Sequence, residues 1–160
     1  MRPVYVRLAM RSAAALYGLG AALLGIACAL EEEPGVRVAI GGLAALALAV
    51  ALLLIWMDGT GRDSLRLVFA TDLLAVAIIA VFVAITEGAH SAYAVYFVLA
   101  ALHAAAFQPR RRVLAAMAIT TAAFFAPFAY DSEDASWFAG VAIPSLLPAL
   151  AIVWVTHLVV

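Results

Sequence analysis

Residues 38–57 read VAIGGLAALALAVALLLIWM, twenty consecutive positions without a charged side chain. An α-helix rises 1.5 Å per residue, so this stretch is about 30 Å long, the thickness of the hydrocarbon core of a bilayer. The whole chain of 160 residues has the same character, because 68% of its residues are hydrophobic and 12% are charged. A soluble domain this short has too little interior to hide so much apolar side chain from water. We therefore expect an integral membrane protein of the all-α class.

Five further apolar stretches lie on either side of this one, each bounded by charged or turn-forming residues. The six predicted transmembrane spans, which together form one domain over residues 1–160, are 12–30, 38–57, 67–86, 91–107, 113–130 and 137–160. Short connections, such as Gln108-Pro109, make consecutive helices antiparallel neighbours. The sequence thus predicts a six-helix antiparallel bundle.

The arginines set the expected orientation of this bundle. Of the nine basic residues, all arginine, only Arg37 falls on the side of the first connection, where acidic residues gather. The other eight are Arg2, Arg7, Arg11, Arg62, Arg66, Arg110, Arg111 and Arg112. Short arginine-rich segments stay in the cytoplasm, so we expect both termini on the cytoplasmic side of the plasma membrane. A formal net charge of −1 gives no reason to expect a nucleic-acid partner.

Asp72 is the only carboxylate well inside a predicted span. It lies six residues after Arg66, about 9 Å deeper along a helix. His103 lies seven residues before Arg110, at a similar depth in the antiparallel neighbouring span. The two side chains can therefore meet. We expect Asp72 in the bundle interior rather than against lipid, with His103 or Tyr96 as its hydrogen-bond partner. Three interpretations stay open for the pair: a structural hydrogen bond, a switch that a ligand or proton alters, and ligation of haem.

Several residues accompany this pair in the candidate site. Tyr93 and Tyr96 share one helical face with His103, so they are candidate ligand or switch residues as well as ordinary bundle core. His157 falls near the expected cytoplasmic end of the last span, which makes bis-histidine haem ligation with His103 conceivable. Haem apart, we expect no cofactor and no metal.

The last predicted span is unusual because Pro144 and Pro148 each remove a backbone donor, one turn apart. We expect a bend there that suits a signal-transmission helix ending near His157. No arginine or other polar anchor follows, and we therefore expect the native helix to continue beyond Val160 into a cytoplasmic domain.

Small residues recur at four-residue spacing in the first two spans, for example at Ala14, Gly18 and Ala22, and at Gly41 and Ala45. Such ridges let helix backbones approach closely in lipid. They fit either packing of the first span on the second or the seam of a homodimer.

No nucleophile elbow, phosphate loop, metal-binding spacing or carboxylate pair appears, so no catalytic residue is expected within these 160 residues. The single cysteine, Cys28, excludes an internal disulfide.

The order of residues from Asp72 to Arg112 resembles the six-helix amino-terminal membrane module of bacterial signalling proteins. An aspartate stands early in a helix, followed by Glu87-Gly88-Ala89-His90-Ser91-Ala92-Tyr93, then Tyr96-Phe97, then a helix that closes on Arg110-Arg111-Arg112. Such modules occur in actinobacterial sensor histidine kinases and GGDEF diguanylate cyclases, and modules of similar size precede class III adenylate cyclases. In place of the proline that such turns often carry, this chain has Ala92.

The resemblance implies a dimeric membrane sensor or anchor that passes a signal through its last helix to a cytoplasmic enzyme domain in the same chain. The alternative is a small transporter or proton-coupled carrier with Asp72 as the coupling carboxylate. The two halves of the chain show no inverted repeat, since Asp72, His103 and Pro144 have no counterparts in residues 1–66, and this counts against a transporter.

Overall fold

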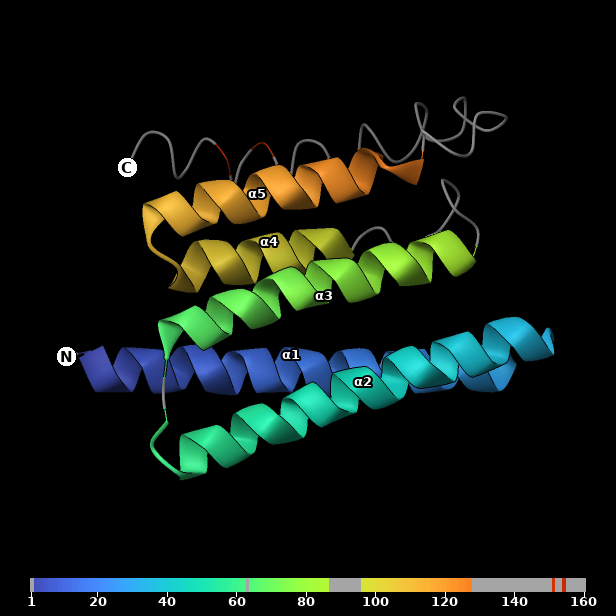
Figure 1. The fold of residues 1–160 in the computed structure, drawn as a ribbon, viewed down its shortest axis with the longest axis horizontal. Coiled ribbons are helices and arrows are strands. Elements are labelled where there is room, and N and C mark those ends of the chain that lie inside the picture. Colours follow the sequence, from blue (N-terminus) through green and yellow to red (C-terminus); the bar gives the residue numbers. More distant parts are fainter. Residues whose placement is uncertain (1, 63, 87–95, 128–150, 152–153, 155–160) are drawn as a thin grey trace. The chain divides into compact units, whose positions relative to one another are not determined.

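The computed structural model describes residues 2–62, 64–86, 96–127, 151 and 154. In this part of the chain there are five α-helices and no strand, so the all-α prediction is confirmed for it. The helices are α1 (Arg2–Leu30), α2 (Pro34–Gly59), α3 (Leu65–Ile85), α4 (Tyr96–Phe107) and α5 (Arg110–Phe125), as labelled in Figure 1.

The fold divides into two compact units, Met1–Thr71 and Asp72–Val160. The boundary falls inside α3, directly before Asp72. Helix α3 therefore contributes its residues up to Thr71 to the first unit and the remainder to the second.

In the first unit, α1 and α2 pack against each other as an antiparallel hairpin (Figure 1). Two polar contacts mark its ends. Near the start of α1, Arg11 Nε donates to Asp58 Oδ2 at 2.8 Å, close to the end of α2. At the opposite end, Cys28 Sγ donates to the carbonyl of Arg37 at 3.4 Å. The buried side chains of α1 and α2 are apolar apart from the hydroxyl of Tyr17, as expected where two apolar helices pack on each other.

The acidic connection between these helices is an ordered turn. The Glu31 carboxylate accepts the backbone N–H groups of Glu32 and Glu33, each at 3.0 Å. Arg37, in the first turn of α2, donates through Nε to the carbonyl of Glu31 at 2.8 Å. Helix α2 then begins at Pro34, whose missing N–H costs nothing in the first helical turn.

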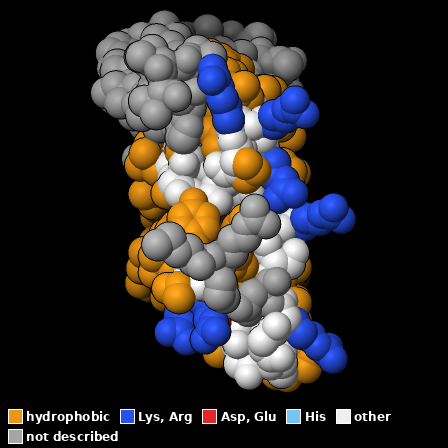
Figure 2. Space-filling view, turned by 90° about the vertical axis from the view of Figure 1, so that its left-hand side faces the viewer, with side chains coloured by type: hydrophobic (Ala, Val, Ile, Leu, Met, Phe, Trp, Pro, Cys, Tyr) orange, Lys and Arg blue, Asp and Glu red, His pale blue; other side chains and the backbone are white. Residues whose placement is uncertain are grey.

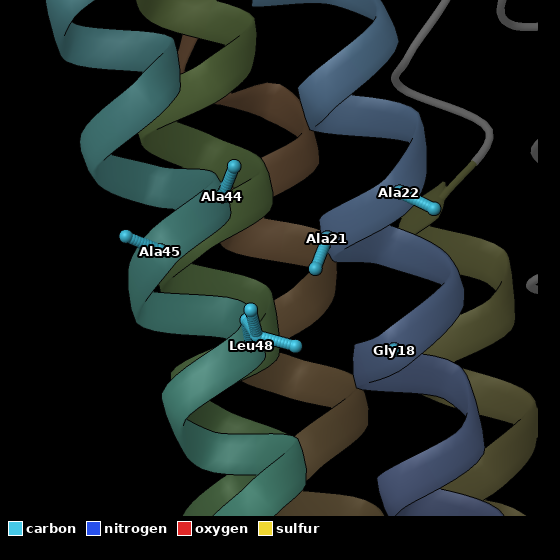
Figure 3. A pocket seen from close by; sticks show the side chains of 6 residues that line it. All are labelled: Gly18, Ala21, Ala22, Ala44, Ala45 and Leu48. Carbon is cyan, nitrogen blue, oxygen red and sulfur yellow. The ribbon is translucent and has the colours of Figure 1, made fainter.

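The glycines in the small-residue ridges of α1 and α2 do not mark close backbone approach. A Cβ added at Gly41 would lie 3.5 Å from Cys28 Sγ, whereas one added at Gly18 or Gly25 would meet nothing within 4 Å. Around Gly18 the two helices leave an open hollow of about 330 Å³, shown in Figure 3. It is lined by Gly18, Ala21, Ala22, Ala44, Ala45 and Leu48. Packing of the first span on the second is therefore present, but it does not use these glycines.

The turn from α2 to α3 depends on Gly61, which has a φ of 69°. Its N–H donates to the carbonyl of Asp58 at 3.2 Å, and the N–H of Arg62 donates to the carbonyl of Met57 at 3.1 Å. This pair of bonds is the Schellman motif, which satisfies the last carbonyls of a helix and favours glycine at the left-handed position.

In the second unit, α4 and α5 are joined by only Gln108 and Pro109 and pack on each other. Together with the second part of α3 they enclose an apolar core in which Phe97 and Phe124 meet edge to face, with ring centroids 6.2 Å apart. The buried members of this core are Val76, Val83, Phe97, Ala101, Val113, Met117 and Phe124. This core holds α3 and α4 side by side at the level of the candidate site.

Three helices are long and apolar enough to cross a membrane, counted over the described ranges alone: Val4–Leu30, Pro34–Gly59 and Leu65–Ile85. Tyr96–Phe107 is apolar but shorter. Large apolar side chains such as Leu30, Val38 and Ile55 are 60% to 77% exposed. Long apolar helices with apolar outer faces are typical of a membrane protein.

Four helices begin before their predicted spans, each time across at least one arginine: α2 begins at Pro34 rather than Val38, and α3 at Leu65 rather than Leu67. Helix α1 begins at Arg2, ten residues before the predicted start at Ser12, and α5 begins at Arg110 rather than Val113. The reason is that a span was delimited by hydrophobicity, whereas a helix also continues through arginine, a good helix former. Cations in the first turn of α5 oppose the helix dipole, so they do not stabilise this helix end.

Of the other predicted spans, 91–107 is described from Tyr96 onward and 113–130 as far as Pro127. The last span, 137–160, lies outside the described residues except for Ala151 and Trp154, which are helical. Six spans and the position of the two termini stay predictions.

Candidate functional site

Asp72 lies in α3, seven residues after Leu65 and therefore about 10 Å along the helix axis from its start. It is 5% exposed. A carboxylate this well buried in an apolar helix bundle is expensive unless hydrogen bonds and a partner compensate the lost hydration. Residues of the second unit supply the hydrogen bonds and the partner.

His103 is the first partner, as the matched depth of the two residues predicted. Its Nδ1 lies 2.7 Å from Asp72 Oδ1, and the side chain is 5% exposed. With the carboxylate ionised, Nδ1–H is the donor, which assigns the hydrogen to this nitrogen from the contact itself. The ring also packs on Phe107, one turn further along α4, with centroids 5.0 Å apart. This packing and the hydrogen bond together hold the ring in place.

Gln108 is the second partner, and sequence reasoning assigned it only to a turn. Its Nε2–H donates to Asp72 Oδ2 at 3.1 Å, and the residue is 6% exposed. The signal that could have identified it was composition, because Gln108 is the only carboxamide side chain in the chain. A carboxamide side chain at the end of an apolar helix can hydrogen-bond to a buried carboxylate. Whether it does so depends on the turn after the helix, which sets the direction of the side chain.

Each oxygen of Asp72 thus accepts one hydrogen bond from a different segment: Oδ1 from α4, and Oδ2 from the α4–α5 turn. We call Asp72, His103 and Gln108 the carboxylate network. The carbonyl oxygen Oε1 of Gln108 is buried and has no hydrogen-bond partner. The network is therefore incompletely satisfied, and one acceptor is left over inside the bundle.

The chemistry available to the network is proton sharing and a change of charge. A proton that moves along the 2.7 Å hydrogen bond from Nδ1 to Oδ1 converts an imidazolium–carboxylate pair into two neutral groups. A proton gained on the other ring nitrogen, Nε2, raises the charge of the site by one unit. In a low-dielectric interior such a change alters the strength of both hydrogen bonds to Asp72.

The remaining predicted site residues are not brought to this network by the described contacts. Tyr96 begins α4, seven residues and about 10 Å along the axis from His103, and is half-buried. Tyr93, Pro144, Pro148 and His157 lie outside the described residues. The structure therefore does not test the bis-histidine arrangement, although it shows that His103 Nδ1 is engaged with Asp72. No group of three or more histidine, cysteine, aspartate or glutamate side chains suited to a metal ion occurs in the described ranges.

Comparison with known proteins gives no relative: no family model, no curated protein and no solved structure matches this chain. The assignment of function thus depends on the fold and on the carboxylate network.

Proposed function

We propose that this chain is a membrane-embedded sensor or anchor module in which the carboxylate network is the switch. A change of charge at Asp72 or His103 passes to a cytoplasmic signalling enzyme domain in the same chain, in a homodimer. The observation that supports the proposal is that one buried carboxylate holds two other segments through its two oxygens.

The strength of the network depends on charge in a way that an ordinary helix–helix contact does not. Hydrogen bonds to an ionised carboxylate are about twice as strong as neutral ones. If Asp72 becomes neutral, its hydrogen bonds with His103 in α4 and with Gln108 both weaken. Gln108 precedes Pro109 and the arginines of α5, so the weakened contact reaches the arginine-rich side of the protein first.

A spin label at Arg111 tests this coupling. Arg111 is exposed on the first turn of α5, three residues after Gln108, and replacing Cys28 by serine leaves a cysteine at position 111 as the only thiol. Asp72→Asn removes the charge and keeps the size, and we expect it to change the mobility of the label. Thr120→Val is the matched control, because Thr120 is 1% exposed and its hydroxyl has no partner.

The same two substitutions test the signalling role in the native full-length protein. We expect Asp72→Asn to shift the activity of the enzyme domain in membranes several-fold, and Thr120→Val to leave it unchanged. If both variants match the parent in label mobility and in activity, the network is only a structural hydrogen bond and the proposal fails.

A proton-coupled carrier is the second candidate, because a buried carboxylate bonded to histidine is also the arrangement of proton relays in membranes. Protein reconstituted in vesicles with an internal pH-sensitive dye separates the two. Proton flux that Asp72→Asn abolishes would assign the carrier function, whereas a sensor conducts no protons above protein-free vesicles.

A further inference from the structure

The first three turns of α1 present an exposed face that mixes large apolar side chains with arginine. Val4 is 73% exposed and Leu8 56%, one turn apart, and Tyr5 beside them is 43% exposed. Arg7 and Arg11 form an adjacent exposed row, also one turn apart.

The opposite face of the same turns is the packed one. Ala9 and Met10 have no exposed surface, and Ala13 is 3% exposed. The exposed face is therefore not the part of α1 that holds the fold together.

The end of α2 continues this surface within the same unit. Arg11, whose side chain is 69% exposed, donates to Asp58 Oδ2 and so fixes the start of α1 beside the end of α2. Trp56 is 55% exposed, and the guanidinium carbon of Arg62 lies 5.6 Å from the centre of its ring. Arg66, on the first turn of α3, is also exposed.

The charge of this surface is strongly one-sided. We call Val4, Tyr5, Arg7, Leu8, Arg11, Trp56, Arg62 and Arg66 the basic end of the first unit. Among the described residues near it, the one carboxylate is Asp58, which is 12% exposed and bonded to Arg11. Figure 2, which faces the end where α1 begins and α2 ends, shows arginine side chains beside exposed hydrophobic ones.

We propose that the basic end binds the headgroups of anionic phospholipids in the surrounding bilayer. Guanidinium groups pair with phosphate through two parallel N–H donors, which a lysine cannot do. Val4, Leu8 and the rings of Tyr5 and Trp56 enter the acyl-chain boundary, where amphipathic aromatic rings are favoured. The structure carries this inference independently of the carboxylate network, which lies in the other unit.

Charge complementarity and the apolar neighbours together favour lipid over other anions. A surface for nucleic acid or for an acidic protein needs basic groups surrounded by water, and here they stand directly next to large exposed apolar side chains, which lipid favours. At α1, 29 helical residues extend about 43 Å, roughly 13 Å more than the hydrocarbon thickness. The excess carries the basic end to the headgroup level.

The test counts phosphatidylglycerol and phosphatidylcholine molecules retained by the purified protein in neutral detergent, by native mass spectrometry. We expect phosphatidylglycerol to be retained preferentially. Arg7→Gln and Arg66→Gln should each weaken its binding about fivefold, and the double variant about 25-fold, because each arginine near an anionic surface contributes about this factor. Arg37→Gln is the matched control, since Arg37 is exposed at the opposite end of the hairpin and should leave binding unchanged.

Equal retention of the two lipids would overturn the proposal, and so would an Arg37→Gln effect as large as that of Arg7→Gln. Displacement of phosphatidylglycerol by polyglutamate at equal charge concentration would assign the surface to an acidic protein partner and likewise overturn it. All variants are compared after circular dichroism shows unchanged helix content, so that a folding defect is recognised as such.

Discussion

The hydroxyl of Tyr17 donates a hydrogen bond to the main-chain carbonyl of Thr71 at 2.6 Å, and both residues are buried. This bond ties α1 to the first part of α3 inside the first unit. Thr71 is also the residue directly before Asp72, so the bond fixes the backbone where the carboxylate network begins.

Tyr17→Phe is expected to lower the free energy of unfolding by about 1 kcal/mol, the usual contribution of one buried hydrogen bond. The measurement is unfolding by SDS titration in mixed micelles, followed by circular dichroism. Tyr5→Phe is the control, because the hydroxyl of a 43% exposed tyrosine exchanges its partner for water at little cost. Equal effects of the two substitutions would show that the Tyr17 bond contributes nothing specific.

Replacing Asp72 by leucine should destabilise the protein by about 2–5 kcal/mol, because the N–H groups of His103 and Gln108 both lose their acceptor inside the bundle. Asp72→Asn keeps one acceptor oxygen and should cost about 1 kcal/mol. The same SDS unfolding assay measures both. Asp58→Asn, which affects an ion pair with an exposed arginine, should cost less than about 1 kcal/mol. A leucine variant as stable as the Asp58 variant would remove the carboxylate network from any account of this fold.

Gly61→Ala is expected to destabilise the α2–α3 turn by about 1–2 kcal/mol, because a Cβ is strained at a φ of 69°. Gly59→Ala is the matched control two residues earlier. Gly59 is the last residue of α2 and an added Cβ there meets nothing within 4 Å, so alanine should be neutral or slightly stabilising. Thermal unfolding of both variants in detergent gives the comparison, and a neutral Gly61→Ala would contradict the capping role.

The predicted orientation is tested by single cysteines in a Cys28→Ser background, labelled with a membrane-impermeant maleimide on intact cells. Cysteines at Gly35, Glu87 and Ser132 should react, and those at Gly61 and Pro109 should react only after the membrane is opened. The reason is the concentration of arginine on one side. External labelling at Pro109 would reverse the orientation or change the number of spans.

Purified protein is expected to be colourless, since Asp72 and Phe107 account for the burial of His103 without a haem. The measurement is an absorption spectrum after expression with added haem precursor. A Soret band that disappears on replacing either His103 or His157 would establish haem ligation at these two residues.

The candidate site was predictable in part. Depth along a helix follows from residue counting, so Asp72 and His103 could be placed at the same level from the order of residues alone. Gln108 could not, because the direction of a side chain at a helix end depends on how the chain turns into α5. The lengths of the apolar segments in α2 and α3 were likewise evident from the sequence. The helical continuation of α1 through Arg11, Arg7 and Arg2 was not, because hydropathy marks the segment suited to lipid, whereas a helix extends as far as its backbone hydrogen bonds continue.

The length and composition of the apolar stretches are enough to establish that this protein is helical and suited to a membrane, because the free energy of apolar surface in lipid depends on those two quantities. Residue order also identifies the two polar residues that share a depth. Two features could be learned only from the packed helices: where α1 and α2 leave the hollow beside Gly18, and which donor takes the second oxygen of Asp72. Both depend on how each helix is rotated about its axis relative to its neighbour. That rotation is set by the packing of whole helix surfaces, so it cannot be predicted from one short stretch of sequence.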